Sequence, residues 1–267
     1  MDNRPVGIFD SGLGGLTAVR EFKKLLPNEN IIYFGDTGRM PYGVRPAEEI
    51  RIIAGQNLAY VASRGVKAMI AACGTISSTA DDILQQSETP VCGVLKPGVK
   101  ELCASASPVV GVIATATSIQ SGAYEREIAS ISPEKTVVAI SCPKFVPLIE
   151  SGHYDKNDEK VREAIAEYLV PMKGAGVGTL LLGCTHYGLI GEAIEDYFGG
   201  RVTLVGAAEA AADEMRDYLC ANGLTGSGGS EDRFCTSGSV EEFERLGRLF
   251  LGRDITGSVE YVPPFPI

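Results

Sequence analysis

Short apolar runs alternate with longer amphipathic segments along this chain, and that alternation limits the folds open to it. Helix-like patterns, with apolar residues every three or four positions, occur for example at 16–26, 46–64 and 158–173. Strands that alternate with helices predict parallel sheets, right-handed crossovers and helices on both faces, which is the α/β class. The apolar or β-branched runs are each followed by a turn, and they occupy 5–10, 30–36, 67–73, 108–114, 135–141, 178–184 and 201–207.

The runs form two groups, one before about residue 97 and one from about 108 to 206, which predicts two similar α/β domains related by pseudo-symmetry. We expect the active site in the cleft between them and a hinge at GVLKPGV, residues 93–99. The expected first domain is 1–97 and the second 98–207. The remainder, 208–267, carries helix-like patterns at 207–222 and 239–251 around a Gly/Ser turn at 223–230, and is expected to return to the first domain.

The charge balance narrows the choice of partners. Twenty-four Lys and Arg stand against 34 Asp and Glu, a net charge of −10, which repels phosphate backbones and anionic lipid surfaces. We therefore expect neither nucleic acid nor a membrane as partner. An anionic small molecule has to be held by local backbone donors or hydroxyls. Because the sequence has no leader pattern and no apolar run of about 18 residues, a soluble cytoplasmic protein is expected.

Two of the seven cysteines occupy matching places. Without CxxC pairs or metal-finger spacing, the cysteines predict reduced thiols rather than disulfides or a metal site. Cys73 and Cys184 each end an apolar run and are followed by a threonine, Thr75 or Thr185, and by a helix-like pattern. The other five are interpreted as small buried residues: Cys92, Cys103, Cys142, Cys220 and Cys235.

Four loops are expected at the carboxyl ends of strands, where ligands bind in open α/β sheets: 9–15, 35–43, 72–78 and 183–188. The first imitates a dinucleotide-binding fingerprint, but its third glycine position is Thr17, so NAD is not favoured. A tight strand-to-helix turn remains the structural alternative. Asp10, at a strand end, is a functional candidate, because its carboxylate can bind an ammonium group or orient a thiol.

The matched thiols suggest proton-transfer chemistry. A helix start favours the thiolate of the cysteine before it, and hydroxyls such as those of Thr75 and Thr185 bind carboxylates there. His186 can share a proton with Cys184, whereas His153 is expected in a solvated loop. Two thiols facing each other across a cleft can remove a proton from one face of a carbon and return one to the other. This predicts a racemase or epimerase that needs no cofactor and no metal.

Five stretches closely resemble the glutamate racemases of the aspartate/glutamate racemase superfamily: FDSGLGGL (9–16), YFGDTGRMPYG (33–43), SGAYE (121–125), CPKFVPLIE (142–150) and LLGCTHY (181–187). The resemblance implies cofactor-independent interconversion of L- and D-glutamate, which supplies bacterial peptidoglycan and so cell-wall growth and cell shape. It also implies a homodimer.

The resemblance also assigns residues. Cys73 matches the thiol that acts on the D enantiomer and Cys184 the one that acts on the L enantiomer, with Asp10, Glu150 and His186 assisting. Gly74 stands where the family usually has an asparagine that binds the α-carboxylate, and Ser118 where it usually has threonine. The expected substrate-binding set is Asp10, Ser11, Pro41, Tyr42, Gly43, Gly74, Thr75, Thr117, Ser118, Thr185 and His186, with Ser11, Tyr42 and Gly43 holding the side-chain carboxylate.

Other functions remain open at this point. A racemase of aspartate or another acidic amino acid shares the thiol pair and differs in the side-chain pocket. A cysteine hydrolase using Cys184 and His186 leaves Cys73 unexplained. A two-domain amino-acid-binding protein has the same architecture without chemistry, although binding needs no paired thiols.

Overall fold

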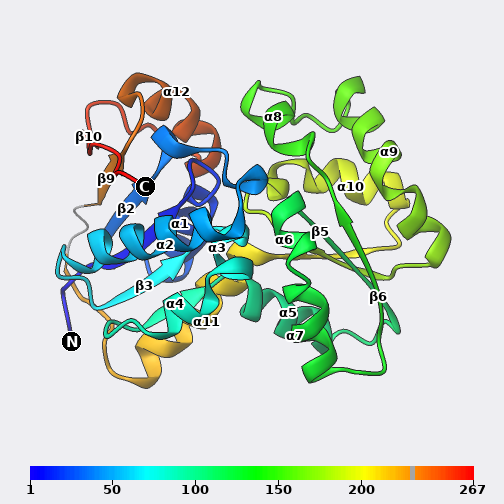
Figure 1. Cartoon of the computed structure of the whole chain (residues 1–267), viewed down its shortest axis with the longest axis horizontal. Coiled ribbons are helices and arrows are strands. Elements are labelled where there is room, and N and C mark those ends of the chain that lie inside the picture. The colour runs from blue at the N-terminus through cyan, green and yellow to red at the C-terminus, as the bar shows by residue number, and fades with distance from the viewer. Residues whose placement is uncertain (229–231) are drawn as a thin grey trace.

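The computed structural model describes residues 1–228 and 232–267, which build two parallel sheets that lie side by side with helices around them (Figure 1). The larger sheet has the strand order β10-β9-β2-β1-β3-β4 and the smaller one β6-β5-β7-β8. Every strand pairing in these described ranges is parallel. The predicted α/β class with two parallel sheets is confirmed.

The strands closest to the middle of the larger sheet are continuous apolar runs. All five positions of β1 (Val6–Asp10) and of β2 (Ile31–Gly35) are buried, as expected for parallel strands covered on both faces. The other strands of this sheet are β3 (Ala68–Ala71), β4 (Val91–Gly93), β9 (Arg233–Thr236) and β10 (Val259–Tyr261). The smaller sheet consists of β5 (Val109–Ala114), β6 (Thr136–Ser141), β7 (Thr179–Leu182) and β8 (Thr203–Gly206).

The expected hinge at residues 93–99 is wrong. Residues 93–99 are not a hinge loop, because Gly93 ends β4 and helix α5 begins at Leu95. Pro97 lies in the first turn of α5, where its missing N–H costs no helical hydrogen bond. The helices of this part are α1 (Leu16–Leu25), α2 (Ala47–Ala62), α3 (Gly74–Thr79), α4 (Asp81–Gln85) and α5 (Leu95–Ala104), with 3-10 turns η1 (Thr37–Arg39) and η2 (Tyr42–Val44).

The rest of the chain holds the remaining helices. They are α6 (Ala116–Gln120), α7 (Ala123–Ile131), α8 (Phe145–Glu150), α9 (Glu159–Ala175), the 3-10 helix η3 (Tyr187–Ile190), α10 (Gly191–Phe198), α11 (Ala207–Ala221) and α12 (Val240–Leu251). The Gly/Ser turn expected at 223–230 lies partly outside the described residues. No helix in the described ranges is long and apolar enough to cross a membrane.

The carboxy-terminal segment returns to the larger sheet. Strand β9 pairs with β2, β10 pairs with β9, and α11 and α12 both pack against α1. The buried ammonium of Lys67 lies 2.6 Å from Glu29 Oε2 and donates to the carbonyls of Asp2 and Leu224, both at 2.7 Å. The Lys67 ammonium therefore ties the amino-terminal residues and the segment after α11 to the start of β3.

Two interpretations of single residues need correction. All seven cysteines are free, but Cys220 is exposed on α11 rather than buried, and Cys92 and Cys103 are only half-buried. His153 is also half-buried, and its Nδ1 lies 2.7 Å from Asp158 Oδ2, so it is not simply a solvated loop residue.

Candidate active site

A cavity of about 240 Å³ lies where the carboxyl ends of strands from both sheets face each other. Asp10, Cys73 and Cys184 reach it from β1 and from the loops after β3 and β7, as expected of ligand sites in parallel sheets. Of the residues that the sequence predicted, the cavity wall brings together Asp10, Ser11, Pro41, Tyr42, Gly43, Cys73, Gly74, Thr75, Glu150, Cys184, Thr185 and His186.

Thr117 and Ser118, the other two predicted residues, do not line the cavity. The Thr117 hydroxyl donates to the Gly43 carbonyl at 2.8 Å, and the fully buried Ser118 hydroxyl lies 2.8 Å from Thr115 Oγ1. Sequence reasoning missed Thr115, which does line the cavity and whose hydroxyl lies 3.0 Å from that of Thr75. Its position directly after a strand was the available signal.

The surroundings of Cys73 keep its thiol protonated. Burial and the negative charge of Asp10 raise the pKa of Cys73 to about 12, although hydrogen bonds from the Ile76 backbone and from Ser11 oppose the shift. Asp10 Oδ2 accepts hydrogen bonds from the backbone N–H groups of Gly15, at 2.8 Å, and Gly12, at 3.3 Å. The expectation that the helix start would favour the Cys73 thiolate is wrong, because α3 is only six residues long and desolvation outweighs it.

Cys184 has the opposite surroundings. Its sulfur lies 3.7 Å from His186 Nδ1, and His186 Nε2 lies 3.0 Å from Glu150 Oε1. Burial lowers the pKa of His186, but hydrogen bonds to Cys184 and Glu150 and their charges outweigh it and raise the pKa to about 10. No helix starts directly after Cys184, because η3 begins only at Tyr187. A protonated imidazole, rather than a helix dipole, therefore places positive charge beside this sulfur.

The lining of the cavity includes two carboxylates, and His186 is the one basic side chain among its described lining residues. Asp10 and Glu150 line it, and none of its described lining residues is Lys or Arg. Tyr42 lines it too, but its hydroxyl donates to Asp36 and accepts from Asn57 Nδ2 at 3.1 Å. The part of Tyr42 that can serve a ligand is therefore its backbone.

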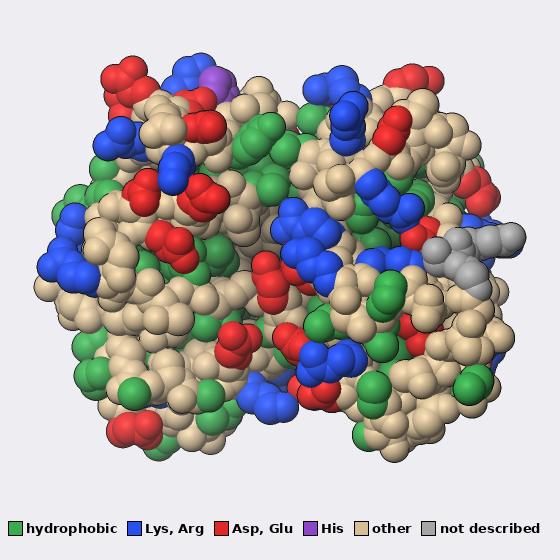
Figure 2. Space-filling view, turned by 180° about the vertical axis from the view of Figure 1, so that it is seen from behind, with side chains coloured by type: hydrophobic (Ala, Val, Ile, Leu, Met, Phe, Trp, Pro, Cys, Tyr) green, Lys and Arg blue, Asp and Glu red, His purple; other side chains and the backbone are tan. Residues whose placement is uncertain are grey.

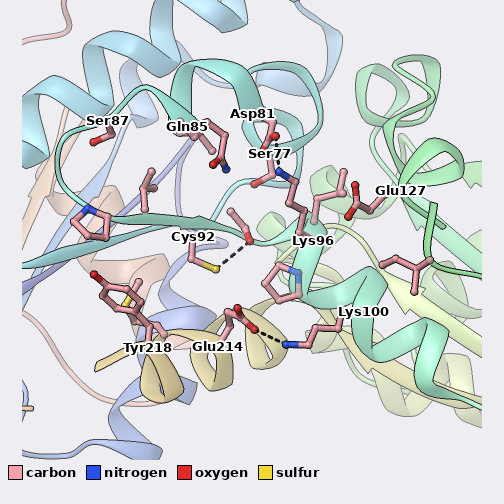
Figure 3. A pocket seen from close by; sticks show the side chains of 18 residues that line it. Ser77, Asp81, Gln85, Ser87, Cys92, Lys96, Lys100, Glu127, Glu214 and Tyr218 are labelled. Atoms are coloured by element: carbon pink, nitrogen blue, oxygen red, sulfur yellow. Dashed lines mark hydrogen bonds and ion pairs between the residues drawn. The ribbon is translucent and has the colours of Figure 1, made fainter. Parts of the chain in front are cut away.

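A second cavity, of about 480 Å³, lies between α4, β4, α5 and α11 (Figure 3). Its lysines are already paired, Lys96 with Asp81 at 2.7 Å and Lys100 with Glu214 at 3.0 Å. On the rear of the molecule, positive and negative side chains are intermixed along the boundary between the two halves (Figure 2). The paired thiols and the protonated histidine make the first cavity the candidate active site.

The fold and the site together are those of a racemase. The Asp/Glu/Hydantoin racemase family matches residues 17–215, and the chain belongs to this family. Within it, the chain is 39% identical to glutamate racemase 2 of Caldanaerobacter subterraneus over 257 residues, 96% of each chain. It is 38% identical to the glutamate racemase of Streptococcus gordonii, over 98% of this chain and 99% of the relative.

Solved structures agree. The glutamate racemase of Francisella tularensis in complex with D-glutamate has a TM-score of 0.91 and 37% identity over 98% of both chains. The aspartate racemase of Picrophilus torridus, at a TM-score of 0.56 and 17% identity, covers 82% of this chain and 94% of its own and shares the fold alone.

Proposed function

We propose that this protein is an isomerase that interconverts L- and D-glutamate by two-base proton transfer, without a cofactor. The observation that carries the proposal is one cavity with two thiols in opposite surroundings, Cys73 beside a carboxylate and Cys184 beside a protonated imidazole. Relatives at about 38% identity over nearly the full chain, which are glutamate racemases, support the choice of substrate.

In the proposed reaction the Cys184 thiolate takes the α-proton of L-glutamate, and the Cys73 thiol gives its proton to the opposite face of the same carbon. Each turnover therefore moves one proton onto Cys184 and one off Cys73, and the reverse reaction starts from D-glutamate. His186 stabilises the thiolate of Cys184, and Glu150 holds His186 in place. Asp10 keeps the Cys73 thiol protonated and is available to the substrate ammonium.

Binding of the two carboxylates is assigned to two different sets of donors in the cavity wall. Ser11 and the backbone of Tyr42 and Gly43 receive the side-chain carboxylate. The hydroxyls of Thr75 and Thr185, with the backbone of Gly74, receive the α-carboxylate. Thr117 and Ser118 act from behind this surface, through Gly43 and Thr115 respectively.

We further propose a cytoplasmic homodimer that supplies D-glutamate for peptidoglycan, with domains at 1–97 plus 208–267 and at 98–207. Membership of β9 and β10 in the larger sheet supports this division, although the boundary at 97 falls within α5.

The deciding experiment incubates the pure protein with L-glutamate in heavy water without added cofactor and follows optical rotation and α-deuterium content. Loss of rotation with gain of deuterium is expected, and it should be faster than with L-aspartate. Unchanged rotation while glutamate still binds would indicate a binding protein instead.

A further inference from the structure

A buried polar network lies directly behind the Pro41–Gly43 segment of the cavity wall. Asp36, at the end of β2, is fully buried, and its Oδ1 accepts a hydrogen bond from Ser237 Oγ at 2.5 Å. Its Oδ2 accepts from Arg39 Nε at 2.7 Å and from the Tyr42 hydroxyl. One carboxylate thus joins the cavity wall to the segment after β9.

Arg39 extends this network to the end of the chain. Its side chain is 6% exposed, its Nη2 donates to Asn57 Oδ1 at 2.8 Å, and its Nη1 donates to Gln56 Oε1 and to the Phe265 carbonyl at 3.2 Å. Gln56 Nε2 in turn donates to the Pro266 carbonyl at 2.7 Å. The last residues of the chain therefore complete the coordination of the arginine that holds Asp36.

In such a network, displacement of one side chain also displaces the groups that are hydrogen-bonded to it. A buried ion pair is stable only with its remaining donors and acceptors satisfied, and a partly satisfied network is costly. Tyr42 is itself buried and is held by both Asp36 and Asn57, so a shift of Arg39 displaces the backbone that faces the cavity.

We propose that Asp36 and Arg39 are positioning residues that set the affinity for the substrate's side-chain carboxylate, and that the carbonyls of Phe265 and Pro266 complete the hydrogen-bond network around them. The inference rests on the proposed function, in which the Tyr42–Gly43 backbone receives that carboxylate. Neither thiol belongs to the network. Loosening it is therefore expected to raise KM for glutamate while kcat is retained, a split that a general loss of folded protein does not produce.

The test compares Arg39→Lys with Arg51→Lys. Lysine keeps the charge but cannot make the forked contacts of a guanidinium. Arg51, on α2, also pairs with an aspartate, Asp82 at 2.6 Å, away from the cavity, and serves as the matched control. Arg39→Lys should raise KM for L-glutamate on the order of tenfold, with kcat within about threefold of the parent. Arg51→Lys should change neither.

Gln56→Met is the second variant, because it removes both the Arg39 and the Pro266 contact without touching the Asp36–Arg39 pair. It too should raise KM alone, and it keeps the test decisive if Arg39→Lys does not fold. If the parent racemises glutamate but the Gln56→Met variant has the parent's KM, or a lower kcat instead, this inference is overturned and the proposed function stands. A parent that neither racemises nor binds glutamate would overturn the proposed function and this inference with it.

Discussion

A β-carbon on Gly74 would lie 2.1 Å from the carbonyl oxygen of Gly183 on the facing loop, a separation that real side chains do not reach. That oxygen is fixed, because it accepts a hydrogen bond from the buried Tyr124 hydroxyl at 2.9 Å. Glycine at position 74 therefore allows the two thiol-bearing loops to approach each other directly. An asparagine, the usual residue of the family here, does not fit this conformation.

Gly74→Ala and Gly74→Asn are accordingly both expected to lower kcat/KM for glutamate. The loops have to separate by roughly 1 Å, and a misplacement of that size costs on the order of 10²-fold in rate. The alanine variant adds the β-carbon without the amide, so equal losses in steady-state assays identify the steric cause. Tighter glutamate binding by Gly74→Asn alone would show that the amide reaches the substrate and that the close approach is not required.

Replacing one thiol separates two bases from one. Cys73→Ala should abolish racemisation in both directions, because each turnover needs one donor and one acceptor, with a loss of about 10²- to 10⁴-fold. The remaining Cys184 should still exchange the α-proton of L-glutamate with solvent deuterium, with retention of configuration, as followed by NMR. Cys184→Ala should show exchange with D-glutamate only, and more slowly, because the raised pKa of Cys73 leaves little of its thiolate. Racemisation by Cys73→Ala at nearly the parent rate would refute the two-base mechanism.

His186 should remain an imidazolium through neutral pH, since its pKa is raised to about 10. A raised pKa stabilises the fold fully below the unfolded value near 6.5, and this contribution disappears as the pH rises through about 10. Nitrogen-15 NMR of the His153→Gln variant, which contains a single histidine, measures this directly. The imidazolium signal should persist from pH 6 to 9, and Glu150→Gln should lower the midpoint. A midpoint near 6.5 in the His153→Gln variant that retains Glu150 would contradict the raised pKa of His186.

The buried pair of Lys67 and Glu29 offers a prediction on stability alone. Lys67→Met leaves the Glu29 carboxylate buried without its cation, which should lower the free energy of unfolding by roughly 3–5 kcal/mol. The double variant Lys67→Met/Glu29→Gln should recover part of that loss in urea denaturation, because no unpaired charge remains. Equal losses in both variants would mean that the carbonyl contacts of Lys67, rather than the charge pair, carry the effect.

The sequence predicted the parts of the fold that local patterns determine. The seven expected runs all contain strands, and the expected helices at 46–64 and 239–251 agree with α2 and α12 within two residues. Strands β4 and β10 were missed because they have only three residues each, and β9 was missed because it begins with an arginine. Their strand character comes from pairing with neighbours that lie far away in sequence.

The site shows the same division. That both thiols, Asp10 and His186 line one cavity could be predicted from their places at strand ends and in the loops after strands, but the protonation of Cys73 could not, because it depends on burial and on the charge of Asp10. The close approach of Gly74 to Gly183 likewise requires the two sheets to be placed in space.

The return of the carboxy-terminal segment also has a consequence for biosynthesis. During translation β2 is made long before its neighbour β9 and the carbonyls that Arg39 requires. Until residues 233–266 have been made and have emerged from the ribosome, β2 has an open edge and Arg39 lacks part of its hydrogen-bond network. The emergence of this segment, rather than synthesis of the thiol-bearing loops, therefore completes the support behind the substrate segment.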